Sequence, residues 1–167
     1  SEMCIRDSYK LGVVATVSRV AKLPGEGDIV RVSVKGMYRA RLNGIVSSEP
    51  HLVGAIRACA ICKYDRENEY GQALIRSAKS IFEGYAQSAP QLSPDVVLAV
   101  LGFDHPGDMA DFIAGNIALE FSDRQSVLEE LDPIKRLEKL CVLLLKESRL
   151  LEYEDEIQEL SLIHISE

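Results

Sequence analysis

The sequence predicts an α+β fold, in which a small antiparallel β subdomain (residues 9–65) is followed by an α-helical bundle (residues 66–160) that ends in a long helix. Three observations lead to this prediction. Apolar residues alternate with polar ones in the first part of the chain and later recur every three or four residues. Turn-forming residues separate the first extended segments. An Asp-Pro pair then starts the longest run with helical periodicity.

A β-hairpin is predicted near the start of the chain. Residues 11–21 are rich in β-branched side chains, and residues 22–28 (KLPGEGD) supply turn chemistry. Residues 29–35 then alternate, with valines on one face and polar side chains on the other. Gly36 is expected to interrupt this strand, after which the alternation resumes in residues 38–42. A last extended run is expected up to about Tyr64.

The helical part contains recognisable helix starts. Ser93 is predicted as an N-cap, with a proline at the first helical position, and Pro106 is predicted to open the next helix. Ser122 and Gln125 form a capping-box pattern before a third helix. Apolar positions at helical spacing are expected to form the core; they are Leu74, Ala78, Ile81, Phe82, Tyr85, Val96, Val97, Val100, Leu101, Met109, Phe112, Ile113, Ile117, Val127, Leu128 and Leu131.

The last predicted helix begins at Asp132-Pro133 and carries Ile134, Leu137, Cys141, Leu144 and Leu151 on one face. If it reaches Leu160 it is about 40 Å long, more than four short helices can cover. Its distal end is strongly acidic and poor in apolar residues, so we expect that end to project as a stalk or connector.

The two ends of the chain differ from their neighbours in pattern. Residues 1–8 and 161–167 resemble strings that arise when sequencing adapters are translated, and we expect both to be a non-native leader and tail. On this interpretation the chain is a fragment, and its native termini are not in the sequence.

Composition restricts the classes of partner. The 167 residues carry a formal net charge of −7, which argues against a nucleic-acid backbone as the main partner, because phosphate binding needs a surplus of Lys and Arg. No apolar run approaches the roughly 18 residues of a membrane span. No signal peptide is recognised, so we expect reduced thiols and a cytoplasmic location.

Motifs for catalysis, cofactors or metals are not found. The sequence contains neither a phosphate-binding G-x-x-x-x-G-K-[ST] loop nor a G-x-S-x-G elbow. His51 and His105 are predicted to be solvated or helix-capping. Cys59 and Cys62 form a lone CxxC, which in a strand would point its thiols to opposite faces, so both are expected to be buried apolar residues, as is Cys141. We therefore predict no catalytic, cofactor-binding or metal-binding residue.

Three segments, in this order and spacing, resemble the N-terminal domain of the ATP-dependent Lon protease family. Residues 11–40, with LGVVA, KLPG and IVRVSVKGMYRA, resemble its β core. Residues 104–114 (DHPGDMADFIA) and 125–140 (QSVLEELDPIKRLEKL) resemble two of its helices. The resemblance covers about residues 9–160. It implies a PUA-like β subdomain, incomplete at its N-terminus, followed by the helical subdomain. We therefore expect an unpaired sheet edge and an apolar surface that the full protein would cover.

The same resemblance implies a function. In that family this region selects unfolded or damaged proteins and supports assembly of a hexamer, while later domains use ATP and Mg and cut peptide bonds with a Ser–Lys dyad. We therefore expect a substrate-recognition and assembly domain that binds unfolded or damaged protein. Met37 and Phe103, apolar residues beside turns, are the candidates for substrate contact, and ordinary core positions are the alternative interpretation.

Other functions stay open at this point. The chain could be a stand-alone Lon-type substrate-binding protein without ATPase or protease. RNA binding is a more distant alternative, suggested by the PUA-like sheet and by Arg31, Lys35, Arg39 and Arg41, which form a local basic cluster in the sequence. An enzyme built on the CxxC comes last.

Overall fold

The protein forms two compact units, which a computed structural model defines as residues Ser1–Ala60 and Ile61–Glu167. The structure describes residues 8–22, 25 and 29–165. In these ranges no helix combines the length and the apolar character that crossing a membrane requires. The predicted α+β class is confirmed, because three strands precede five helices in the described residues.

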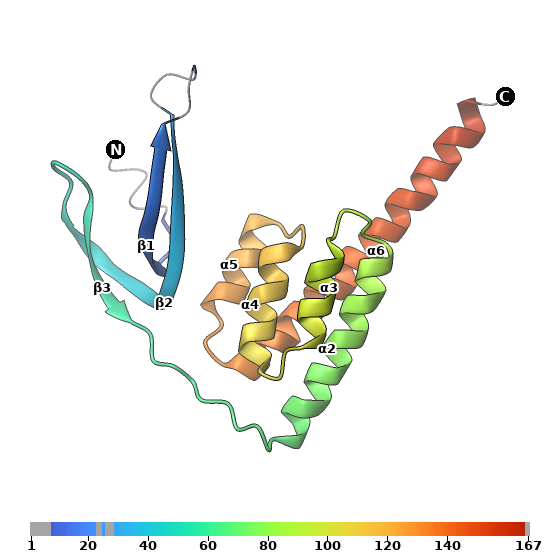
Figure 1. Cartoon of the computed structure of the whole chain (residues 1–167), viewed down its shortest axis with the longest axis horizontal. Coiled ribbons are helices and arrows are strands. Elements are labelled where there is room, and N and C mark those ends of the chain that lie inside the picture. Colours follow the sequence, from blue (N-terminus) through green and yellow to red (C-terminus); the bar gives the residue numbers. More distant parts are fainter. Residues whose placement is uncertain (1–7, 23–24, 26–28, 166–167) are drawn as a thin grey trace. The chain divides into compact units, whose positions relative to one another are not determined.

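The first unit is a three-stranded antiparallel sheet of β1 (Leu11–Lys22), β2 (Val30–Ser47) and β3 (Val53–Ala58), in the order β1-β2-β3 (Figure 1). The predicted hairpin is confirmed, since β1 pairs with β2 from Leu11 opposite Arg41 to Lys22 opposite Val30. Most of its predicted turn lies outside the described residues. The long β2 pairs with β3 through its second half, so β1 and β3 are the edges of the described sheet.

Gly36 does not interrupt β2, contrary to the prediction. The strand runs through it and carries a bulge instead, because Tyr38 pairs with Val14 while Gly36 pairs with Ala15, which leaves Met37 as an extra residue. A Cβ on Gly36 would lie 3.3 Å from Val13 Cγ1, so the glycine relieves crowding between strands. A second irregularity in the same hairpin leaves Ser18 of β1 without an opposite residue. Such bulges change which face of the sheet the following side chains occupy.

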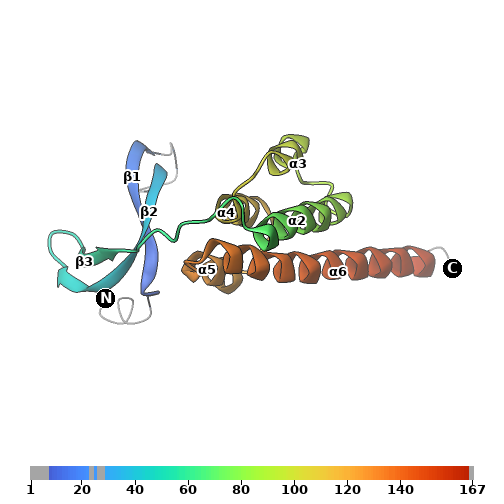
Figure 2. The same ribbon diagram turned by 90° about the horizontal axis from the view of Figure 1, so that it is seen from below.

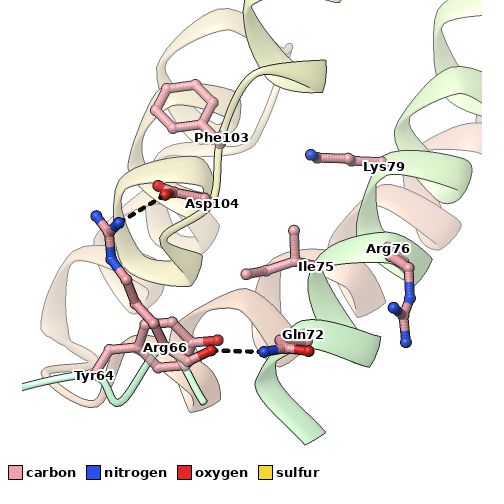
Figure 3. A pocket seen from close by; sticks show the side chains of 8 residues that line it. All are labelled: Tyr64, Arg66, Gln72, Ile75, Arg76, Lys79, Phe103 and Asp104. Atoms are coloured by element: carbon pink, nitrogen blue, oxygen red, sulfur yellow. Dashed lines mark hydrogen bonds and ion pairs between the residues drawn. The ribbon is translucent and has the colours of Figure 1, made fainter. Parts of the chain in front are cut away.

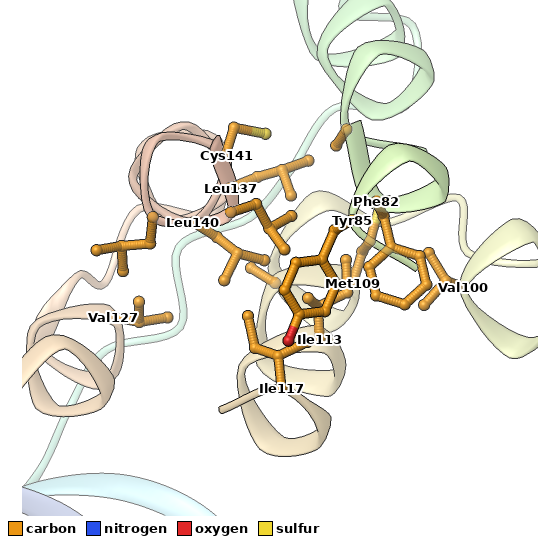
Figure 4. Packing of buried hydrophobic residues seen from close by; sticks show 14 of the residues in the cluster. Phe82, Tyr85, Val100, Met109, Ile113, Ile117, Val127, Leu137, Leu140 and Cys141 are labelled. Atoms are coloured by element: carbon orange, nitrogen blue, oxygen red, sulfur yellow. The ribbon is translucent and has the colours of Figure 1, made fainter. Parts of the chain in front are cut away.

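The second unit consists of α2 (Glu69–Gln87), α3 (Pro94–Leu101), α4 (Pro106–Asn116), α5 (Phe121–Glu129) and α6 (Pro133–Ile165) (Figure 2). One apolar cluster joins them. Phe82, Met109, Ile113, Leu137 and Leu140 are fully buried at its centre (Figure 4). Cys141 is buried in it as predicted, and burial, with Glu138 nearby, raises the pKa of its thiol to about 11.

Most of the predicted helix starts are confirmed. The Ser93 hydroxyl accepts from the Asp95 amide in front of Pro94, and the His105 ring accepts from the Asp108 amide in front of Pro106. The capping box is wrong. α5 begins at Phe121 with Glu120 as N-cap and no side-chain cap, because the Arg124 amide bonds to the Glu120 carbonyl and closes the first turn earlier. Ser122 therefore lies inside the helix.

A buried arginine fastens α4 to the connection between α5 and α6. Arg136, only 7% exposed, donates to the carbonyls of Glu130 and Leu131 at 2.7 and 3.3 Å and contacts Asp111 Oδ2 at 3.2 Å. α4 approaches α6 closely at Gly107, where a Cβ would lie 3.0 Å from Pro133 Cβ and 3.1 Å from the Arg136 guanidinium. A side chain at Gly107 would therefore crowd this junction.

The last helix is longer than predicted. α6 continues to Ile165, so it includes part of the expected tail, and its 33 residues span about 50 Å. From Glu152 onward its described residues are exposed, and its C-terminal part runs beyond the other helices of this unit (Figure 2). The predicted projection of this end is confirmed.

Candidate functional site

The first candidate surface is an exposed set of valines on one face of the β1–β2 hairpin. Val17 lies opposite Val34 and Val20 opposite Val32, so these four side chains share a face, and the register adds Val13 and Val30 to it. We call Val13, Val17, Val20, Val30, Val32 and Val34 the valine face. Each of the six is 45% to 60% exposed. An apolar surface of this kind normally marks an interaction site.

Met37 lies on the opposite face of the same hairpin. Its sulfur accepts a hydrogen bond from Thr16 Oγ1 at 2.9 Å, and Thr16 points away from its neighbour Val17. The side chain is 62% exposed, so interpreting Met37 as an ordinary core residue is wrong. Its exposure results from the bulge, which places it beside Tyr38, also exposed. Contact of Met37 with substrate stays a prediction.

The basic residues of β2 do not form one surface. Arg31 and Lys35 lie on the face opposite the valines, whereas Arg39 pairs with Val13 and shares the valine side of the sheet. Arg41 follows Arg39 on that side and lies opposite Arg57 of β3. The predicted basic cluster is therefore divided between two faces by the bulge at Met37. This removes the main argument for RNA binding along β2.

The second candidate surface is a pocket within the helical unit, with a volume of about 340 Å³ (Figure 3). Its lining consists of Tyr64, Arg66, Gln72, Ile75, Arg76, Lys79, Phe103 and Asp104. Phe103, the other predicted contact, is partly buried and packs against the ring of Phe112 with centroids 5.2 Å apart. It therefore supports the core and lines the pocket at once. Its contact with substrate also stays a prediction.

The polar side chains of this pocket are mostly basic. Arg66 pairs with Asp104 at 3.1 Å, and its carbonyl accepts from Gln72 Nε2 at 2.7 Å (Figure 3). Lys79 Nζ donates to the Leu101 carbonyl at 2.7 Å. Three cations and one carboxylate leave the lining with two positive charges in excess. The sequence prediction included Phe103 but missed the α2 residues, although their spacing at 72, 75, 76 and 79 marks one helical stripe.

A second hollow in this unit, of about 520 Å³, lies between α6 and the segment from Ala118 to Arg124. Its lining combines apolar side chains with three carboxylates, Glu120, Glu147 and Glu154, and two cations, Arg124 and Lys146. Burial is the largest cause that raises the pKa of Glu147; Lys146 opposes the shift, and the carboxylates of Asp123, Glu120 and Glu154 add to it. The negative charge of Glu147 itself is therefore disfavoured in this hollow.

The remaining candidates for chemistry do not converge. Cys62 is exposed and Cys59 only partly buried, so interpreting both as buried residues is wrong for Cys62; β3 ends at Ala58 and both follow it in irregular backbone. His51 is exposed, and His105 caps α4, as predicted. In the part of the chain that the structure describes, no three His, Cys, Asp or Glu side chains form a metal-binding group.

Comparison with known proteins gives a consistent result. The family described as the ATP-dependent protease La (LON) substrate-binding domain matches residues 2–146. The chain is 35% identical over 159 residues to a Lon protease of Desulforamulus reducens, covering 93% of this chain and 19% of that protein. It is 32% identical over 154 residues to a Lon protease of Escherichia coli K12, covering 92% of this chain and 19% of that protein. The chain thus spans about a fifth of the length of these curated relatives.

Solved structures show the same fold. The N-terminal domain of a Mycobacterium avium complex Lon protease superposes with a TM-score of 0.64 at 20% identity, covering 86% of this chain and 72% of that one. A Lon N-terminal domain protein from Xanthomonas campestris gives a TM-score of 0.54 at 18% identity, covering 81% of this chain and 69% of that one.

Proposed function

The chain belongs to the family of Lon substrate-binding domains, and from this premise we propose that it binds unfolded or damaged protein segments and delivers them to an ATP-dependent protease. The parent protein would be a serine endopeptidase of the Lon type, with ATP and Mg bound by other domains. Such a parent would act in the cytoplasm as a hexamer, and this domain would contribute to its assembly. This chain itself would bind the substrate and would not catalyse its cleavage.

The observation that carries the proposal is the valine face. Unfolded proteins differ from folded ones by displaying apolar side chains, and burying such groups against exposed valines is favourable by about 25 cal/mol for each Å² removed from water. The six valines are β-branched and fixed in paired strands, so they lose little side-chain freedom on binding. Apolar contacts that need no specific hydrogen bonds to substrate side chains suit a domain that must bind many sequences.

Affinity at one such surface would be modest. A substrate segment that touches several copies of the domain in a hexamer would bind more tightly, because the second contact occurs at high effective concentration. Met37 on the other face of the hairpin could extend the contact in a segment that wraps the edge β1. This arrangement favours weak binding of substrate over tight binding. Weak binding suits a protease, because the bound segment must be released to the later domains.

The proposal is tested by changing the valine face without changing its shape. Val17→Thr with Val34→Thr replaces two exposed methyl groups by hydroxyls on a facing pair and keeps β-branched residues in the sheet. We expect the affinity of the 167-residue chain for a dye-labelled, permanently unfolded polypeptide to fall about threefold to tenfold, as expected for about one to two methyl groups no longer buried.

Val46→Thr is the matched control, since Val46 is 70% exposed in β2 but does not belong to the valine face. Fluorescence anisotropy gives the affinities, and circular dichroism checks that the fold is kept. Equal affinity in the double variant and the control would remove the valine face from the proposal. Absence of any binding by the unchanged chain would remove the proposed function itself.

A further inference from the structure

The floor of the pocket in Figure 3 is apolar and held in place by neighbours. Ile75 is nearly buried on α2, and Phe103 is supported by the ring of Phe112. Tyr64 stands edge-on against His105 with centroids 5.4 Å apart, and its ring lies so close to Gly71 that a Cβ there would be 2.6 Å away. A floor fixed in this way needs no rearrangement to receive an apolar side chain.

The rim of the pocket carries an excess of positive charge. Arg66 is partly neutralised by Asp104, and Lys79 extends from α2 toward the segment of Phe103 and Asp104, where one of its three donors reaches the Leu101 carbonyl (Figure 3). Arg76 is exposed, and in the described part of the chain its side chain forms no hydrogen bond or ion pair. In Figure 3 Lys79 points toward the segment of Phe103 and Asp104, whereas the Arg76 guanidinium points away from it. Lys79 is therefore the nearer donor, and Arg76, one helical turn away, joins it after a change of side-chain rotamer.

The charge is unusual for this molecule. The whole chain has a formal net charge of −7, yet the lining of this pocket has two more cations than anions. A volume of about 340 Å³ is at the small end for a ligand site and fits one apolar side chain with its adjoining backbone. A small inorganic anion would leave the apolar floor unused. A nucleic-acid backbone would need a row of cations along the surface to match its phosphates, whereas this pocket is a single hollow that also carries a carboxylate.

We propose that this pocket is a second substrate subsite, which binds an apolar or aromatic side chain followed within one or two residues by a carboxylate. The apolar side chain would contact Ile75, Phe103 and Tyr64, and the carboxylate would accept hydrogen bonds from Arg76 and Lys79. The carboxylate can be an acidic side chain or the free carboxyl end of a chain. This inference rests on the proposed function and adds sequence preference to it.

The test uses short labelled peptides in a Gly-Ser background and the 167-residue chain. One peptide carries an internal Phe-Asp step and an amidated end, a second carries Phe-Asn, a third carries Ala-Asp, and a fourth ends in Phe with a free carboxyl group. We expect the Phe-Asp peptide to bind about threefold to tenfold more tightly than the Phe-Asn and Ala-Asp peptides. Comparison of the first and fourth peptides tells which source of carboxylate is preferred.

Arg76→Gln with Lys79→Gln should remove the preference for Asp over Asn and leave binding of the Phe-Asn peptide nearly unchanged. Lys135→Gln with Arg149→Gln is the matched control, because it makes the same change in net charge at exposed positions of α6 outside the pocket. Gly71→Ala should weaken both Phe peptides by displacing the Tyr64 ring, while favouring α2 as a helix. Raising salt to about 0.5 M should reduce only the Asp preference.

Two results would overturn the inference. One is equal binding of the Phe-Asp and Phe-Asn peptides, and the other is loss of the Asp preference in the α6 control as well. Binding of the unfolded polypeptide through the valine face is measured separately, so the proposed function can survive failure of the pocket. If the unfolded polypeptide also fails to bind, the proposed function fails together with the inference.

Discussion

In the helical unit seventeen apolar side chains form one buried cluster, whereas in the β unit only Leu11 and Ala40 are buried among the apolar residues that the structure describes. Both units are rich in aliphatic residues. The helices place theirs toward a shared centre, while the sheet leaves valines exposed on one side of its hairpin and Met37 and Tyr38 on the other. The folding free energy of the described chain therefore comes mainly from the helices, and the sheet supplies surface.

The difference shows that local strand pattern and burial are separate properties. β2 alternates as a half-buried strand would, but its bulges exchange the faces, so that the valine side continues into Arg39 and Arg41. A surface for varied substrates benefits from this, because apolar contact and positive charge follow one another along the same strand. The helical unit in turn provides a fixed pocket. The valine face suits contact with many different sequences, and the pocket suits selection of particular side chains.

The largest effect is expected from a cavity in the helical core. Leu140 is fully buried, so Leu140→Ala should lower the free energy of unfolding by about 3 kcal/mol. Val34→Ala, at a position 60% exposed, should cost about 1 kcal/mol or less. Amide hydrogen exchange measured on separate peptides follows each unit, and urea unfolding gives the total. The comparison breaks if Val34→Ala costs as much as Leu140→Ala, since the sheet would then be stabilised by contacts at that valine.

A smaller effect is expected from the buried arginine, which shows whether the helical unit also depends on a polar junction. Arg136→Met keeps an apolar stem but removes the donors to the carbonyls of Glu130 and Leu131, so the free energy of unfolding should fall by about 2 kcal/mol. Lys135→Met, at the exposed neighbouring position, is the control and should change it by about 0.5 kcal/mol or less. Equal values for both variants would show that the junction contributes no stability.

The smallest effect concerns pH and the hollow beside α6. Because the pKa of Glu147 is raised in the folded state, folding favours its protonated form. This contribution is fully present below the ordinary pKa of 4.5 and is lost as the pH rises through the folded-state value. Glu147→Gln should therefore raise stability near pH 7 by about 0.5 kcal/mol or less, and hardly change it near pH 4.

Urea midpoints of wild type and variant at the two pH values measure this difference. Glu156→Gln is the control, since Glu156 lies in the exposed distal part of α6. A gain that is the same at both pH values would show that the carboxyl group of Glu147 is not responsible.

The helical unit was predictable because its signals are local. Pro94, Pro106 and Pro133 stand at the first helical positions that their chemistry favours. The predicted core positions are buried or partly buried, except Leu101, which is 40% exposed and was predicted wrongly. The start of α5 was missed because a backbone bond to Glu120 closes the turn without any side-chain cap. α6 extends beyond its predicted end. Its helical backbone continues through an exposed segment that does not pack against the other helices of this unit.

The candidate sites were less predictable, because both depend on contacts between distant residues. Met37 was chosen as an apolar residue beside a turn position, and its contact with substrate stays a prediction. Its exposure follows from the pairing of Val14 with Tyr38, which no local pattern encodes. Phe103 was chosen for the same reason, and its contact with substrate also stays a prediction. Its pocket needs Arg76 and Lys79 from α2, and their charges are meaningful only when the segment of Phe103 and Asp104 packs beside them.

The length of α6 has a mechanical consequence. Its first part packs mainly against α2 and α4, while about 20 Å of helix after Glu152 stands clear of the core of this unit. Because a continuous helix is stiff, we expect a force applied at its far end to be transmitted along the helix axis to the buried residues Leu137, Leu140 and Leu144. Because α6 lies along its neighbours, that force loads many side-chain contacts in shear at the same time. Load applied to α6 beyond Glu152 is therefore expected to be shared by the apolar contacts of the helical unit.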